Sequence, residues 1–336
     1  MYLILNIFSF IFLLFFFKYI AKSFNFLDKP NIRKIHKGEI PLIGGIVIYL
    51  NLLLFYFLFN FNNLEELIFL TSGVLVILGA LDDYMILGIR FRLFAQLICS
   101  LIVVGSGLLI QNIGAYMYIQ NIEIGFLSVL FTVFCIMGLT NSFNFIDGLD
   151  GLCASITIIS IISIFSFAYF DGTIAQDYNY YFYIFFILNL LLFFLFNLSK
   201  KNKVFLGDAG SLFLGFYVSC LLIYFSQSTS SILHPVLTIW CVTLPVFDIF
   251  SVTIRRLLKK QNPFVADRTH IHHCLLNLGF SQNKVLYIIV FISITLNFIG
   301  FIIYFILGPM EAITIFLILM IIYIFIKIKY FDKIYV

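Results

Sequence analysis

The chain has 336 residues, of which 62% are hydrophobic and only 11% are charged, and its formal net charge is +4. A soluble domain of ordinary composition carries about 25% charged residues, so this composition excludes an ordinary water-soluble fold. Such an excess of Phe, Ile and Leu requires lipid as the solvent. We therefore predict an all-α polytopic integral membrane protein, with residues 1–336 forming a single transmembrane domain.

Apolar segments close to the roughly 20 residues that a membrane-spanning helix needs recur eleven times along the chain. The predicted spans are 2–20, 42–59, 66–81, 93–110, 126–146, 152–170, 180–197, 206–226, 235–254, 285–306 and 311–327. The first span has no basic segment before it and no small-residue cleavage site, so we do not expect a cleaved signal peptide. The polar interval 111–125 alternates weakly and suggests a short hairpin between two spans.

The basic residues indicate an orientation. With eleven spans, all 20 Lys and Arg residues fall at one face, in or beside the loops 21–41, 82–92, 198–205 and 255–284 and the C-terminal tail. The opposite loops carry only acids, among them Glu65, Glu66, Glu123, Asp171 and Asp177. Cytoplasmic loops are enriched in Lys and Arg, so we expect the N-terminus outside and the C-terminus in the cytoplasm.

The first predicted cytoplasmic loop reads DKPNIRKIHKGEIPLIGG, from Asp28 to Gly45. A basic anchor for anionic lipid headgroups would explain its cations. Lys37, however, lies shortly before Gly44 and Gly45, and cations beside glycines with accessible backbone N–H groups suit a phosphate ligand. We therefore favour anion binding over plain anchoring.

Carboxylates recur at the same predicted face. Asp82 and Asp83 are adjacent where the third span ends, and Asp208 stands between two glycines where the eighth begins. Mg²⁺ takes one or two carboxylates and completes its shell with substrate phosphates and water, so we interpret these loops as parts of a cation site. A solvated helix end would also explain Asp82 and Asp83. Phe205 could stack on a nucleobase, or it is one more of the 44 Phe residues.

The segment NSFNFIDGLDGL, residues 141–152, is the stretch around which the predicted site is organised. Asn141, Asn144, Asp147 and Asp150 recur every three residues where one apolar segment ends and the next begins. Fixed acidic and amide groups at the mouth of a membrane are costly, which favours a chemical role. Gly148 lets the backbone turn sharply and approach a ligand.

The last predicted cytoplasmic loop gathers three histidines. His270, His272 and His273 lie within four residues of one another, beside Asp267 and Arg268. A zinc site would need further ligands at set spacing, and the sequence contains no HExxH motif. Binding of pyrophosphate by His and Arg side chains is therefore favoured over zinc.

Five ordered motifs resemble a known family. They are DKPNIRKIHKGEIPLIGG, LDDYMILGIRFR, NSFNFIDGLDGL, FLGDAGS and DRTHIHH. Together they resemble the polyprenyl-phosphate N-acetylhexosamine-1-phosphate transferases over nearly the whole chain. The HIHH form is typical of the WecA-like branch, whereas the MraY branch carries three consecutive histidines. MraY-like members also tend to have a lysine where this chain has Ile86, which argues against a muramyl-pentapeptide substrate.

The resemblance implies transfer of N-acetylhexosamine-1-phosphate, most often GlcNAc-1-phosphate, from its UDP form to undecaprenyl phosphate, with release of UMP. This step begins synthesis of an envelope polysaccharide such as O-antigen, common antigen or a teichoic-acid linkage. The resemblance also implies Mg²⁺, or Mn²⁺ in its place, and a multi-pass protein in the bilayer of the bacterial inner (cytoplasmic) membrane. No nucleic-acid partner is expected, and a homodimer stays open.

The family's site residues transfer to matching positions of this sequence. By resemblance, the metal is expected at Asp208, with Asp82 and Asp83 as base or metal-positioning groups. The expected catalytic residues are Asp82, Asp83, Asp147, Asp150, Asp208, His270, His272 and His273, and the expected substrate-binding residues are Lys37, Asn141, Asn144, Gly148, Phe205 and Arg268. Phe205 would stack on uracil, and the histidines with Arg268 would contact the pyrophosphate or sugar.

Three alternatives stay open. The same chemistry could use another UDP-N-acetyl sugar, such as UDP-QuiNAc, UDP-FucNAc or UDP-MurNAc-pentapeptide. The lipid phosphate could attack directly, or an aspartyl intermediate could form first. The chain could instead be a transporter, but transporters usually place ionisable groups near the bilayer midplane. Here nearly every candidate group lies at one predicted face.

Overall fold

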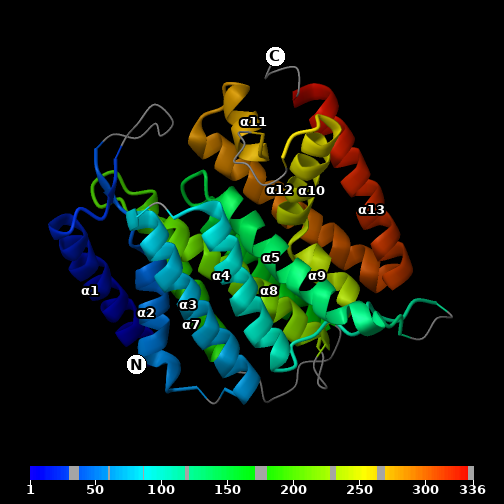
Figure 1. The fold of residues 1–336 in the computed structure, drawn as a ribbon, viewed down its shortest axis with the longest axis horizontal. Helices are drawn as coiled ribbons and strands as arrows, with labels where there is room; N and C mark the ends of the chain where they lie inside the picture. Colours follow the sequence, from blue (N-terminus) through cyan, green and yellow to red (C-terminus); the bar gives the residue numbers. More distant parts are fainter. Residues whose placement is uncertain are drawn as a thin grey trace.

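The computed structural model describes residues 1–29, 38–59, 61–85, 87–117, 121–170, 180–227, 232–262 and 269–331 as a bundle of helices (Figure 1). The helices are α1 (Tyr2–Ser23), α2 (Gly44–Tyr56), α3 (Asn63–Met85), α4 (Ile89–Gly105), α5 (Ser128–Ile146), α6 (Leu152–Phe170), α7 (Tyr180–Asn197), α8 (Gly207–Gln227), α9 (Pro235–Cys241), α10 (Thr243–Leu258), α11 (Ile271–Asn277), α12 (Gln282–Ile306) and α13 (Pro309–Ile326). Gly125–Leu127 forms a 3₁₀ turn and Lys327–Phe331 a π-helical turn. Strands β1 (Leu27–Asp28) and β2 (Ile40–Pro41) pair antiparallel.

Each predicted span coincides with a helix or with the pair α9–α10, in agreement with the all-α polytopic class. Within the described residues, eight helices are long and apolar enough to cross a membrane, and α9–α10, bent by 79°, makes a ninth if it counts as one span. α2 has 13 residues, which is about 20 Å at 1.5 Å per residue. Because a hydrocarbon core is about 30 Å thick, the count of eleven spans stays a prediction.

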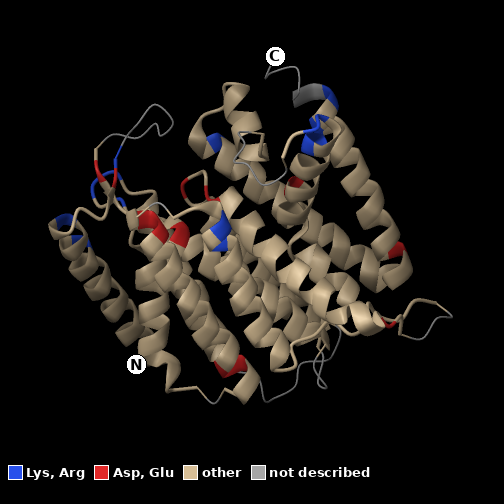
Figure 2. Ribbon diagram, viewed as in Figure 1, with Lys and Arg blue, Asp and Glu red and all other residues tan. Residues whose placement is uncertain are grey.

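The described charges are distributed unevenly along the bundle (Figure 2). Lys and Arg residues lie toward the end of the bundle at which α13 ends, whereas α3 begins at the opposite end with Glu65 and Glu66. α1 begins at that opposite end as well (Figure 1). The one-sided distribution of basic residues therefore holds in three dimensions for the described residues. Which end faces the cytoplasm stays a prediction.

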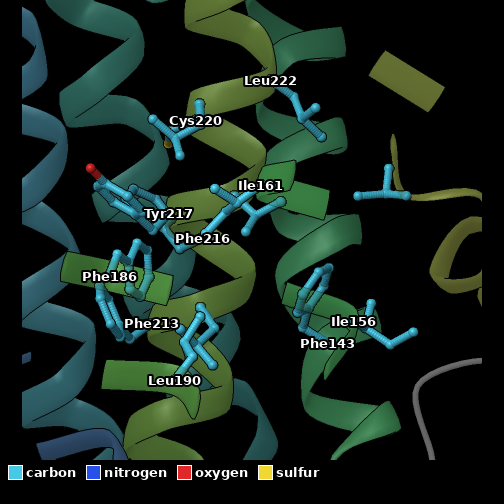
Figure 3. Packing of buried hydrophobic residues seen from close by; sticks show 14 of the residues in the cluster. Phe143, Ile156, Ile161, Phe186, Leu190, Phe213, Phe216, Tyr217, Cys220 and Leu222 are labelled. Carbon is cyan, nitrogen blue, oxygen red and sulfur yellow. The ribbon is translucent and has the colours of Figure 1, made fainter. Parts of the chain in front are cut away.

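Helix α8 forms the centre of the bundle. Its membrane-length window is entirely buried, and it packs mainly against α3, α5 and α2. Figure 3 shows Phe213, Phe216 and Tyr217 of α8 among apolar side chains of α5, α6 and α7. Burial on every side explains why α8 is apolar around its whole circumference.

The first turn of α8 fits against α2 and α3 through glycines. A Cβ at Gly45 of α2 would overlap backbone atoms of Gly210, and a Cβ at Gly79 of α3 would overlap the backbone of Ala209. Small residues let helix backbones approach closely inside a membrane. These glycines thus allow the start of α8 to pack closely between α2 and α3.

The predicted hairpin is confirmed in residues 111–117 and 121–124. Asn112 and Glu123 form an antiparallel bridge, and Ile113 N donates to Ile122 O at 3.0 Å. This hairpin joins α4 to α5.

Candidate active site

The start of α8 is fixed by a carboxylate of α3. The backbone N–H groups of Asp208 and Ala209 donate to the Asp83 carboxylate at 3.1 and 3.3 Å. Gly207 has a φ of 75°, in the left-handed region that favours glycine. Asp83 therefore caps α8, where a negative charge is also favoured by the helix dipole, and it holds Asp208 at the front of the helix.

Arg92 of α4 lies between two of the predicted carboxylates. Its Nε is 3.1 Å from Asp82 Oδ2, and its Nη1 is 3.1 Å from Asp208 Oδ2. The Asp82 side chain is only 5% exposed, so an opposite charge is needed to keep it ionised. The structure thus brings Asp82, Asp83 and Asp208 together, as predicted.

One face of α5 completes the surroundings of Asp208. Asn144 Nδ2 donates to Asp208 Oδ1 at 2.7 Å and to Ser211 Oγ at 2.8 Å. Asn141, one turn earlier on the same face, donates to Gln96 Oε1 at 2.7 Å. Asn144 therefore contacts the predicted metal ligand directly, whereas Asn141 braces α5 against α4.

Asp147 directly follows α5, and its backbone N–H donates to Phe143 O. Its carboxylate has no hydrogen-bond or ion-pair partner among the described residues. Burial raises the pKa of Asp147 well above its usual range, and the nearby carboxylates of Asp208, Asp83 and Asp150 raise it further. Asp147 is thus an acid whose ionised form needs a cation that the described residues do not supply.

Asp150 has its own counter-ion. Lys203 forms an ion pair with Asp150, and its Nζ lies 5.1 Å from the centre of the Phe205 ring. Asn197 accepts a hydrogen bond from the backbone N–H of Gly151, which ties this turn to the end of α7. A cation and an aromatic face therefore lie side by side next to the acidic turn, residues 147–151.

The histidines gather at the start of α11. The ring centres of His270 and His272 are 6.2 Å apart, those of His272 and His273 are 4.1 Å apart, and His270 stacks on Phe145 of α5 at 5.0 Å. Burial and the nearby His273 lower the pKa of His272, so its imidazole is neutral. A Cβ at Gly148 would overlap the His272 ring. Glycine at this position therefore lets the acidic turn and the histidines meet.

The anion-binding hypothesis for Gly44 and Gly45 is wrong. Their backbone N–H groups donate to the carbonyls of Phe205 and Leu206 at 2.8 and 2.9 Å. Because a hydrogen bond to a carbonyl occupies each donor, these groups are not available to a phosphate. The two glycines instead anchor the FLGD turn to α2.

The remaining predictions divide into two groups. Lys37 and Arg268 lie outside the described residues. The other predicted residues surround the starts of α8 and α11, and the contact of Gly148 with His272 joins the two places. Their chemical roles stay predictions.

Several residues of this site were missed by the sequence analysis. Gln96 and Lys203 contact predicted residues directly. Arg92 belongs to the LDDYMILGIRFR motif, but its pairing with Asp82 and Asp208 was not predicted. Asp248 was missed as well, although it is a lone acid inside the predicted span 235–254. An ionisable residue within an apolar segment is by itself a signal of function, and that signal could have revealed it.

The charges of the acidic cluster do not balance. Its five carboxylates, Asp82, Asp83, Asp147, Asp150 and Asp208, pair with two cationic side chains among the described residues, Arg92 and Lys203. Among the described residues, no group of three or more His, Cys, Asp or Glu side chains could by itself hold a metal ion. Excess carboxylate charge suits a hard cation such as Mg²⁺, which takes one or two carboxylates and completes its shell with substrate phosphates and water. The metal stays a prediction.

The chain is similar to known proteins. The profile of Glycosyl transferase family 4 matches residues 66–226. The undecaprenyl-phosphate α-N-acetylglucosaminyl 1-phosphate transferase of Escherichia coli K12 is 30% identical over 289 residues, covering 85% of this chain and 79% of the relative. The proteins of that name from Yersinia pestis and Haemophilus influenzae are 30% and 29% identical, covering 84% of this chain and 78% and 80% of their own lengths.

The helical membrane bundle and these relatives define a membrane phospho-sugar transferase. The chain belongs to glycosyl transferase family 4 and, within it, to the WecA-like branch of the polyprenyl-phosphate N-acetylhexosamine-1-phosphate transferases, as the sequence motifs predicted.

Proposed function

We propose that the chain transfers GlcNAc-1-phosphate from UDP-GlcNAc to undecaprenyl phosphate and releases UMP. The names of its relatives specify this lipid and this sugar phosphate. One observation carries the proposal beyond the names: the acidic cluster, Asn144 and the histidines converge at the basic end of a membrane bundle. We place that end at the cytoplasmic side of a bacterial inner membrane, where the reaction begins an envelope polysaccharide.

A magnesium ion would be held by Asp208 and Asp82. Both carboxylates meet the Arg92 guanidinium, which indicates that their oxygens already face a common position of positive charge. Asp83 would act on the ion through Asp208, because its own oxygens accept from the backbone of α8. A bound Mg²⁺ supplies charge neutralisation on the transferring phosphoryl group.

The chain's own residues would mainly position two phosphates and a nucleotide, which is what phosphoryl transfer asks of a protein. The Phe205 ring would stack on uracil, with Lys203 beside it. His270, His272 and His273, with Arg268, would contact the pyrophosphate or sugar, and Lys37 would lie near the uridine.

We favour a direct displacement. An oxygen of the lipid phosphate forms a bond to the β-phosphorus of UDP-GlcNAc while the bond from that phosphorus to the bridging oxygen breaks. UMP leaves with the bridging oxygen, and the product is a lipid diphosphate sugar. Arg92 lies at Asp208, where it would stabilise charge on the transferring group.

The proposal is tested with detergent-purified protein, undecaprenyl phosphate, MgCl₂ and UDP-GlcNAc, with UMP release as the readout. We expect release that needs the lipid and is abolished by EDTA. Release only from another UDP-N-acetylhexosamine would keep the reaction class and overturn the sugar. Silence with every nucleotide sugar, from folded protein, would overturn the proposed function and return attention to a transporter.

A further inference from the structure

A second cluster of charged groups lies behind the histidines. Asp248 is on α10, and its side chain is 1% exposed. Its Oδ2 is 2.7 Å from His270 Nδ1, and its Oδ1 accepts from the backbone N–H of Ile271 at 3.0 Å. Oδ1 also accepts from Tyr323 Oη at 3.2 Å and from Lys327 Nζ. One carboxylate thus joins α10, the start of α11 and the end of α13.

These contacts determine how His270 presents itself. Because the carboxylate accepts at Nδ1, the proton of a neutral His270 is held on that nitrogen, and Nε2 is the ring atom left for a ligand. The face of the His270 ring is also held in place, because it stacks on Phe145. Phe145 lies in the sequence between Asn144 and the acidic turn. Outer partners of this kind set the tautomer and orientation of functional histidines.

The negative charge of Asp248 is neutralised by groups within the same cluster. Lys327 pairs with Asp248 and donates to Ser251 Oγ at 2.8 Å, and its side chain is only 5% exposed. A buried carboxylate with a cation and several donors is stable only as a complete set, because removal of one partner leaves an unpaired charge. The last helix is therefore tied to the histidine segment through Asp248.

We propose that Asp248 is a positioning residue of the transferase site, holding His270 with Nδ1 protonated and Nε2 directed to substrate, while Lys327 secures Asp248 from the π-helical turn that follows α13. The catalytic part of this inference rests on the proposed function. Asp248 itself touches no substrate and acts through His270.

A double-mutant cycle in the UMP-release assay tests the coupling. We expect Asp248→Asn to lower kcat by about 10- to 100-fold, the range seen for outer partners of functional groups, with a smaller change in KM for the nucleotide sugar. His270→Ala should lower kcat at least as far. If Asp248 acts through His270, the double variant falls no further than His270→Ala, within about twofold.

Ser251→Ala is the matched control in the same buried cluster. It removes one bond to Lys327 and leaves the Asp248–His270 contact in place, so the unfolding temperature should fall while kcat stays near that of the wild type. The proposal would be overturned if the double variant lost kcat by the product of the two single losses. A normal kcat in Asp248→Asn would overturn it as well.

A second measurement does not depend on activity. In ¹⁵N-histidine-labelled protein at pH 8, with the His270→Ala variant identifying the signal, we expect a proton on Nδ1 of His270 in the wild type and a change in Asp248→Asn. A His270 signal without a proton on Nδ1 would refute the inference whatever the substrate. Absence of UMP release with the expected tautomer would instead refute only the proposed function.

Discussion

The acidic cluster at the start of α8 and the Asp248 cluster behind α11 both place carboxylates in a membrane protein, with opposite charge balance. In the acidic cluster, the Asp147 carboxylate has no partner among the described residues, and its pKa is raised by burial and by neighbouring carboxylates. In the other, Asp248 accepts from a lysine, a histidine, a tyrosine and a backbone N–H. A carboxylate whose charge is not neutralised marks a place where a ligand binds. A carboxylate whose charge is fully neutralised marks a structural support of that place.

The largest expected effect is on turnover. Asp208→Asn removes a charge that contacts Arg92 and Asn144 at the centre of the acidic cluster, and we expect kcat to fall by on the order of 10²- to 10³-fold. The measurement is UMP release at saturating MgCl₂, with size-exclusion chromatography as the check of folding. Near-normal activity at low Mg²⁺ would show that Asp208 does not bind the metal.

The close packing of α8 against α2 can be disrupted without changing a charged residue. Gly45→Ala places a Cβ against backbone atoms of Gly210 that cannot move aside, so we expect a loss of about 1–3 kcal/mol of stability together with reduced activity. Gly138→Ala is the matched control, because beyond its own stretch of helix backbone no atom lies within 4 Å of its added Cβ. Thermal unfolding of both variants measures the difference in their stability, and equal stability would contradict the close packing of α8 against α2.

Asp147→Asn and Asp248→Asn should change stability in opposite directions. The folded pKa of Asp147 lies above the ordinary value of 3.8, so its stabilising contribution is present below that value and is lost as the pH rises through the folded pKa. At pH 7.5 the asparagine should therefore raise the unfolding temperature by a few degrees while lowering turnover. Asp248→Asn should lower the unfolding temperature, because it leaves Lys327 without its partner. Shifts of the same sign would remove the distinction between the clusters.

The smallest expected effect is on the pH dependence of stability. His272 has a pKa below the ordinary 6.5, so its contribution is present above pH 6.5 and is lost as the pH falls toward the folded pKa. Between pH 8 and pH 5.5, His272→Phe should therefore lose less stability than the wild type. A variant with an unchanged pH profile would show that His272 is not buried in its neutral form.

The sequence predicted the two clusters unequally. Fixed Asp and Asn residues at the ends of apolar segments predicted the acidic cluster, because fixed acidic and amide groups at the mouth of a membrane are costly. The pairing of Arg92 with Asp82 and Asp208 depends on how α4 is rotated toward α8, which residue spacing does not encode. For Gly44 and Gly45 the sequence misled, since both phosphate binding and close backbone packing favour glycine.

The Asp248 cluster shows the limit of reasoning from local patterns. Lys327, the partner of Asp248, is 79 residues away along the chain. No sequence pattern near either residue predicts the pairing. The bend of 79° between α9 and α10 lies within one predicted span. It follows from tertiary packing, which apolar periodicity alone does not reveal. Lone charges inside apolar segments would have been the useful signal.

The most direct test of the central claim, that the acidic cluster is completed by a cation, is the unfolding temperature of the wild-type protein titrated with MgCl₂ in the presence of UMP. NaCl at matched ionic strength serves as the reference. We expect stabilisation that grows with Mg²⁺ as for any ligand of the folded state, that disappears in Asp208→Asn and that persists in Asp248→Asn. No Mg²⁺-specific shift in the wild type, or an equal shift in Asp208→Asn, would contradict the claim.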